Sequence, residues 1–126
     1  MEKKVEIRAD EPKQRLYILL SGFLTDEEIA DGADKCIACA SKLKPGFDAI
    51  TDISEFKPAS GAGIQHLMRA INFVKEHGVR RAVRISGEAA LSEMQFDRVS
   101  KEAGFDQSIR ITARSVAEAE KILDSK

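Results

Sequence analysis

Two cysteines, Cys36 and Cys39, lie three positions apart inside a helical pattern. This spacing occurs in thiol redox centres and in halves of zinc sites. A redox pair needs the first turn of a helix, whereas the helix here begins at Thr25, about three turns upstream. Zinc would need two more ligands, and the remaining soft donors, His66 and His77, are distant in sequence. We therefore expect both cysteines to pack as small hydrophobic side chains, with no metal and no cofactor.

A short glycine-rich turn precedes the second predicted helix and consists of Ser60, Gly61, Ala62 and Gly63. Glycines let the backbone approach closely, and the first amides of a helix point outward at the positive end of its dipole. The turn therefore predicts a loop that binds an anion, a phosphoserine or a partner protein. The alternative is structural: Ser60 caps the helix, and the glycines allow tight packing against a strand. A dinucleotide fingerprint is excluded because His66 stands where a third glycine is required.

The helix that follows has a second face opposite its apolar stripe, formed by Ala62, His66, Arg69 and Phe73. Intervals of three and four residues place these side chains on one side of a helix. A lone phenylalanine among polar neighbours is typical of the anchor of a contact surface, with Arg69 and His66 supplying polar recognition. The alternative is that Phe73 tucks under the first or third helix, so that the second helix is buried on two sides.

Arginines gather late in the chain. Arg84 and Arg110, on two successive predicted strands, could share a face of the sheet and bind an anion, a phospholipid headgroup or an acidic partner. The alternative is a solvated face on which they pair with acidic side chains from helices.

No nucleophile and base stand in a recognisable catalytic arrangement. One histidine is in mid-helix and the other lies next to a helix-ending glycine. Asp48 and Asp52 share one strand, but carboxylates at such positions also cap loops. We therefore expect that the protein is not an enzyme.

Composition narrows the class of protein further. A chain of 126 residues and 13.9 kDa is long enough for one domain with a continuous core. Its 20 basic and 21 acidic side chains give no excess positive charge, so we expect no nucleic-acid partner. The longest apolar run, residues 16–20, is too short to span a membrane. The charged first residues lead into no apolar signal segment, and we expect a cytoplasmic protein.

Hydrophobic periodicity divides the chain into strands and helices. Strands are predicted at residues 5–9, 15–21, 47–53, 79–86 and 108–112, and helices at 25–44, 61–77, 88–103 and from 115 onward. Capping-box sequences at residues 25–28 and 115–118 mark two of the helix starts. The predicted fold is α/β: a mixed, mostly parallel sheet of about five strands with four helices, in the order β-β-α-β-α-β-α-β-α.

Three segments resemble a known family. They are the β-hairpin at the start, residues 20–25 leading into the first helix, and residues 52–56 followed by residues 60–63. These segments are similar to STAS domains, a family that includes bacterial anti-sigma-factor antagonists and the cytoplasmic tails of sulfate transporters. The resemblance covers nearly the whole chain and implies a single STAS-like domain over residues 1–126. It also implies a non-enzymatic regulatory module that binds a protein partner around the 60–63 loop and the second helix.

The family's second helix begins with Asp-Ser-Ser-Gly, whose first serine is commonly the phosphorylated switch. Aligned without gaps, Ser60 falls on the aspartate and Gly61 on that serine. The resemblance thus implies one of two states. Either Ser60, one place earlier, is an atypical phospho-acceptor in an anti-sigma-factor antagonist-like partner switch, or this branch has lost phosphorylation and keeps only the fold.

Lipid-binding SEC14-like proteins have a related fold and supply the alternative function, a carrier of a small apolar ligand or a lipid. In that alternative the ligand lies between helices and sheet, with the late arginines at its headgroup, and a connected apolar cavity is expected. An edge strand and an exposed helix face would also permit a homodimer.

Overall fold

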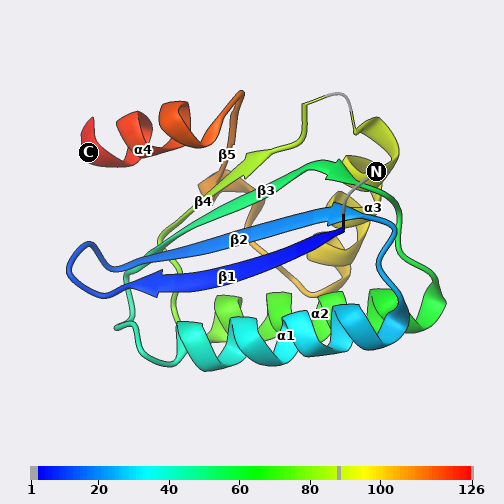
Figure 1. The fold of residues 1–126 in the computed structure, drawn as a ribbon. Coiled ribbons are helices and arrows are strands. Elements are labelled where there is room, and N and C mark those ends of the chain that lie inside the picture. Colours follow the sequence, from blue (N-terminus) through cyan, green and yellow to red (C-terminus); the bar gives the residue numbers. More distant parts are fainter. Residues whose placement is uncertain (1–2, 88, 126) are drawn as a thin grey trace.

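The chain folds as an α/β structure, seen in a computed structural model that describes residues 3–87 and 89–125. In chain order its elements are β1 (Lys4–Asp10), β2 (Arg15–Gly22), α1 (Asp26–Ala40), β3 (Asp48–Phe56), α2 (Gly61–Glu76), β4 (Arg81–Ile85), α3 (Ala90–Glu102), a short 3-10 turn (Gln107–Ile109), β5 (Arg110–Ala113) and α4 (Val116–Ser125). This is the predicted order of strands and helices (Figure 1).

The described strands form one mixed sheet in the order β1-β2-β3-β4-β5. β1 and β2 are antiparallel because a tight turn joins them, with Ile7 opposite Ile18. The other neighbours are parallel because a helix connects each pair, and Ile50 of β3 lies opposite Val83 of β4. The carboxyl ends of four strands, β2 to β5, therefore meet at one edge of the sheet.

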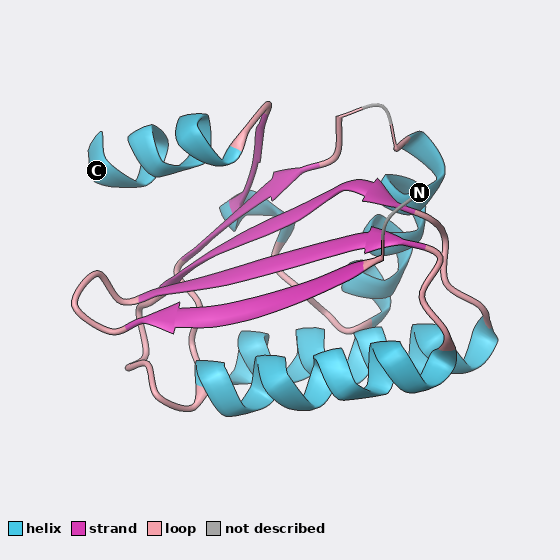
Figure 2. Ribbon diagram, in the orientation of Figure 1, coloured by secondary structure: helices cyan, strands magenta, loops and turns pink. Residues whose placement is uncertain are grey.

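Helices cover the two faces of the sheet unequally. α1 and α2 lie side by side against one face, and α4 lies against the opposite face (Figures 1 and 2). α3 joins α1 and α2, since Phe96 packs in the same cluster as Ile29 and Leu67. α4 buries Ala119 and Leu123 against its own face. The sheet is thus the middle of three layers.

α4 is attached to the sheet by ion pairs around one buried arginine, Arg15. Arg15, at the start of β2, donates to Glu120 and to Asp124 of α4, each at 2.5 Å. The Tyr17 hydroxyl donates to the same Glu120 carboxylate at 2.8 Å. These bonds hold a short terminal helix over the strands. None of the helices described is long and apolar enough to cross a membrane.

Several element boundaries differ from the prediction. β3 continues to Phe56 rather than ending at residue 53, because Phe56 pairs with Gly22 of β2 after an irregularity in register. α1 ends at Ala40, where the Ser41 hydroxyl donates to the Ile37 carbonyl. β4 and β5 each begin two residues later than predicted. α3 begins at Ala90, and residue 88, the predicted start, lies outside the described residues.

Candidate functional site

The turn at residues 60–63 lies beyond the carboxyl end of β3, where α2 begins. Ser60 is at the N-cap position in an extended conformation, as the capping alternative predicts, but its hydroxyl makes no cap hydrogen bond. The hydroxyl instead donates to the Asp26 carboxylate in the first turn of α1. The capping alternative is therefore right about the position of Ser60 and wrong about its hydrogen bond. The Ser60 side chain links α2 to α1 and does not cap the amides of α2.

The two glycines of the turn have different surroundings. A Cβ placed on Gly63 would lie 2.8 Å from Ile29 Cδ1 and 3.2 Å from the Ala59 Cβ, whereas one on Gly61 would meet no atom of the described residues within 4 Å. Gly63 therefore permits tight packing, but against helix α1 rather than against a strand as expected. Ser60, Gly61 and Ala62 are exposed. The first-turn amides of α2, which have no partner within a helix, lie at this exposed corner.

α3 and β2 hold the turn from the other side. The Gln95 side chain accepts from the Ala59 amide at 2.7 Å and donates to the Ala59 carbonyl at 2.9 Å. The Ser92 hydroxyl donates to the Phe56 carbonyl. The Lys57 amide donates to the Gly22 carbonyl at 3.1 Å. The loop between β3 and α2 is therefore fixed to α1, α3 and β2.

Three large apolar side chains lie exposed around this corner. Phe23 is 68% exposed, Leu91 69% and Met94 66%. Phe23 follows directly on β2, and Leu91 and Met94 stand next to the α3 residues that bind the loop. The carboxyl end of β2 and α3 lie at the same end of the sheet (Figure 1). Exposed apolar side chains gathered around a fixed loop are typical of a contact surface.

We refer to these residues as the strand-end surface, which comprises Phe23, Ser60, Gly61, Ala62, Leu91 and Met94. Its apolar residues, Phe23, Leu91 and Met94, were not predicted from the sequence. Phe23 lies in a loop, and Leu91 and Met94 lie off the apolar stripe of α3 that Phe96 and Val99 define. An apolar residue off the stripe of its own helix is the signal that could have identified Leu91 and Met94.

The predicted second face of α2 lies beside α1. Arg69 donates to the Asp34 carboxylate at 2.8 Å, and its other terminal nitrogen lies 3.2 Å from His66 Nδ1. Phe73 is half-buried, with its ring stacked on His77 at a centroid distance of 5.4 Å. For Phe73 this placement corresponds to the alternative of a helix buried on two sides. His66 and Arg69 lie farther toward the strand-end surface.

The cysteines lie where the structural interpretation placed them. Cys36 is 3% exposed, and desolvation raises the pKa of its thiol to about 12. Cys39 is half-buried, with its sulfur 3.8 Å from the Ile7 carbonyl oxygen. Over the described ranges 3–87 and 89–125 there is no cluster of three or more histidine, cysteine or acidic residues that could hold a metal ion.

Arg84 and Arg110 share one face of the sheet, as predicted, but that face is not solvated at these two residues. Arg84 is only 7% exposed and donates to Asp97 of α3 at 2.7 Å. Arg110 approaches the same Asp97 oxygen at 3.7 Å. The predicted pairing with a helix acid is confirmed. The expectation of a solvated face is wrong because α3 covers these strands.

The two strand carboxylates have structural partners. Asp48 accepts two hydrogen bonds each from Arg80 and Arg81. Burial alone would raise the pKa of Asp48, but the hydrogen bonds and charges of Arg81 and Arg80 hold it below its usual value. Asp52 accepts from the amide and the hydroxyl of Ser54 at 3.0 and 2.7 Å. Asp52 therefore binds a residue of its own strand, and the expectation that it caps a loop is wrong because β3 continues to Phe56.

The architecture is that of a STAS domain: a mixed five-stranded sheet, a β-hairpin at its start and four helices in the family's order. A solved structure with this fold is that of a variant of RsbS from Moorella thermoacetica, a STAS-domain protein. The two chains superpose with a TM-score of 0.66 over 97% of this chain and 96% of that chain, at 13% sequence identity. At this identity the likeness shows the fold alone. No protein-family model and no curated protein sequence matches the chain.

Proposed function

We propose that the protein is a non-enzymatic regulatory module that binds a protein partner through the strand-end surface. The observation that carries the proposal is the exposure of Phe23, Leu91 and Met94 around a loop that neighbouring elements hold in place. Large apolar side chains lose water when a partner covers them, and a few such anchors supply most of the affinity of an interface. A fixed loop adds little entropy cost to binding.

The corner at Gly61 and Ala62 offers a second kind of contact. The first-turn amides of α2 are aimed outward beside the positive end of the helix dipole, which favours a carboxylate or phosphate on the partner. Arg69 and His66 lie farther along the same helix and extend the polar part of the surface. The partner that fits best presents apolar side chains next to an acidic group.

Ser60 is the candidate phospho-acceptor of this surface. It is exposed, and its hydroxyl is bound to Asp26. A phosphate here would replace a neutral hydroxyl by about two negative charges beside an existing carboxylate. The phosphate would break the link to α1 and change the charge of the docking surface, which is the property a partner switch needs.

A homodimer through the edge strand β1 stays a prediction, and the exposed residues Lys4, Glu6 and Arg8 oppose it. Charged side chains on an edge strand discourage pairing with another strand.

The proposal is tested by affinity capture from the source organism. Phe23→Glu and Leu91→Glu each place a charge in the apolar part of the strand-end surface. Lys42→Glu is the matched control, because it adds the same side chain at an exposed site near the opposite end of the sheet. Phe73→Glu is a poorer variant, since Phe73 packs on His77 and its loss would disturb the fold.

We expect a captured protein to bind wild type and the control equally and to be lost from both strand-end variants. Each variant must first show a folded circular dichroism spectrum. Equal capture by all four proteins, or capture by none above the level of the bare affinity matrix, would contradict docking at this surface.

A further inference from the structure

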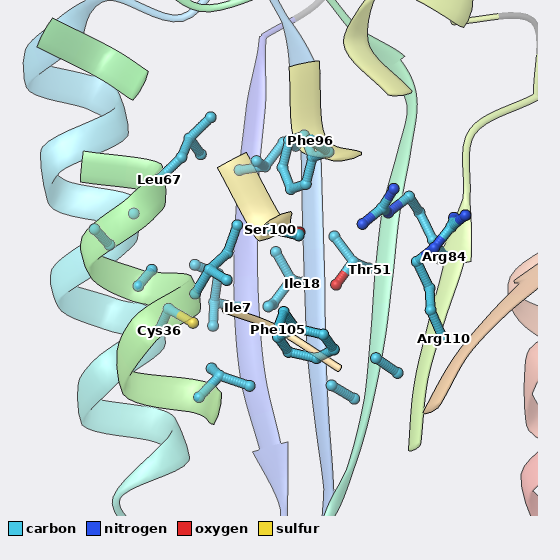
Figure 3. A pocket seen from close by; sticks show the side chains of 18 of the residues that line it. Ile7, Ile18, Cys36, Thr51, Leu67, Arg84, Phe96, Ser100, Phe105 and Arg110 are labelled. Atoms are coloured by element: carbon cyan, nitrogen blue, oxygen red, sulfur yellow. The ribbon is translucent and has the colours of Figure 1, made fainter. Parts of the chain in front are cut away.

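A cavity of about 100 Å³ lies between the sheet and helices α1, α2 and α3. One side is apolar and is formed by Cys36 of α1, Leu67 of α2 and Phe96 of α3, among others. Figure 3 shows Cys36 and Leu67 on this side, two arginines on the far side, and Phe105 between them. The space therefore has an apolar body and a cationic side.

The cationic side is formed by Arg84 of β4 and Arg110 of β5. Both approach a single Asp97 oxygen, at 2.7 Å for Arg84 and 3.7 Å for Arg110. Arg110 Nη1 is buried and has no hydrogen-bond partner among the residues that the structure describes. The next carboxylate on α3, Glu93, is bound by the Ser86 hydroxyl.

The charges of Asp97 and, without a direct bond, Glu93 offset the burial of Arg84 only in part. Burial lowers the pKa of Arg84, and the charge of Arg110 lowers it further, in spite of the bond to Asp97. A buried N–H group without an acceptor costs free energy that a bound acceptor would recover. A carboxylate is well suited, because its two oxygens match the planar geometry of guanidinium.

The size of the cavity selects the ligand. A cavity of about 150 Å³ holds benzene, so one of about 100 Å³ holds roughly four non-hydrogen atoms, which is enough for the hydrocarbon part of a short carboxylate whose two oxygens lie against the arginines. Drug-sized molecules occupy pockets of about 300–1,000 Å³, and a lipid chain is too large. The lipid carrier is therefore not supported, although an apolar space is present where that alternative expected one.

We propose that this cavity binds a short-chain monocarboxylate, with the carboxylate at Arg110 and Arg84 and the alkyl chain against Leu67 and Phe96. The hydroxyls of Thr51 and Ser100, which also line the cavity, offer further donors to the carboxylate. This site is separate from the strand-end surface, and neither proposal depends on the other.

The test is a titration of isotope-labelled protein with butyrate, followed by the chemical shifts of backbone amides. Three matched ligands accompany butyrate: acetate lacks part of the chain, butyramide lacks the charge, and octanoate has a longer chain. We expect butyrate to shift amides of β4, β5 and α3. Acetate and butyramide should each bind at least about tenfold more weakly, since each lacks one of the two features recognised. Octanoate should bind no more tightly than butyrate.

Variants separate the two sides of the cavity. Arg110→Met should abolish the preference for butyrate over butyramide, whereas Arg114→Met, which changes an arginine side chain that is 92% exposed, should keep it. Ala70→Leu places a larger side chain in the cavity wall and should prevent binding of both ligands.

The proposal is overturned if butyrate causes no shifts, if acetate or butyramide binds as well, or if octanoate binds more tightly. Retained binding in Ala70→Leu would also overturn it. If Arg110→Met does not fold, the ligand series on wild type and the Ala70→Leu variant still decide the outcome.

Discussion

The Ser60 hydroxyl hydrogen-bonds to the Asp26 carboxylate and so joins the first turn of α2 to the first turn of α1. The two helices also touch one turn farther on, where the Ile29 side chain packs against Gly63. The exposed corner at the start of α2 is thus positioned by a neighbouring helix as well as by its own strand. A change of charge at Ser60 would act on both helices at once.

We predict that Ser60→Glu is less stable than Ser60→Ala. Both variants lose the hydrogen bond to Asp26, which contributes about 0.5–1 kcal/mol. The glutamate also places a negative charge beside the Asp26 carboxylate, and this repulsion opposes the attraction of the helix dipole. Urea unfolding at neutral pH measures the difference, and high salt should reduce it. Equal stability of the two variants at low salt would show that Asp26 does not sense the charge at Ser60.

Partner binding gives a second readout of the same site. A protein captured by wild type should bind Ser60→Ala with similar affinity and Ser60→Glu at least about tenfold more weakly. Phosphosite mapping by mass spectrometry, after incubation with native lysate and ATP, tests modification directly. If Ser60 is never modified, the proposal of a phosphorylation switch is wrong, but the proposal of a docking surface is unaffected.

The two glycines of the turn should respond oppositely to alanine. Gly63→Ala should lower the free energy of unfolding by about 1 kcal/mol, because the added methyl group meets Ile29 Cδ1 at 2.8 Å and this overlap outweighs the gain in helix propensity. Gly61→Ala should raise it by about 0.5 kcal/mol, since nothing lies within 4 Å. Chemical denaturation of both variants checks the pair. If Gly63→Ala were as stable as Gly61→Ala, α1 and α2 could move apart at Gly63 without a loss of free energy, which would contradict the prediction.

Asp48 should make stability depend on pH in the acid range. Its pKa is lowered from the usual 3.8 in the folded protein by Arg81 and Arg80. The stabilisation is therefore complete above pH 3.8 and is lost as the pH falls through the folded pKa. Asp48→Asn should be less stable than wild type at neutral pH, and the difference should shrink in acid. Urea midpoints across this range provide the measurement, and a constant difference would contradict the assignment.

Cys36 should be unreactive in the folded protein. With a pKa of about 12 and 3% exposure, its thiol is almost entirely protonated and shielded at pH 8. A disulfide-exchange reagent should modify Cys36 only after denaturant is added. Single Cys36→Ala and Cys39→Ala variants assign the observed rates. Rapid modification of folded Cys36 would reopen a redox role for the pair.

The order of elements follows from local patterns in the chain. Period-2 and period-3.6 spacing placed every strand and helix in the right order, and the Thr25 to Glu28 capping box forms as predicted. Boundaries that depend on a neighbouring strand were missed. β3 reaches Phe56 because the end of β2 is there to pair with it, and no property of residues 54–56 alone records that.

The candidate site also has features that the sequence predicts and features that depend on the tertiary structure. The sequence identified the 60–63 turn and the shared face of Arg84 and Arg110, because each depends only on spacing within one element or between two strands. It did not identify the partner of Ser60, which lies 34 residues away in the sequence. Nor could it reveal that α3 covers the arginines, since covering depends on where a distant helix packs.

For this protein the amino-acid sequence by itself determined which segments are strands or helices, and hence a mixed parallel sheet. These properties arise from the alternation of side chains along one segment at a time. Only the tertiary structure decided which apolar side chains remain exposed and which charges become buried. Phe23 and Leu91 are as apolar as any core residue, and they face solvent because none of the described elements packs over them. Arg84 is as polar as any surface residue, and it is buried because α3 crosses its strand and supplies Asp97.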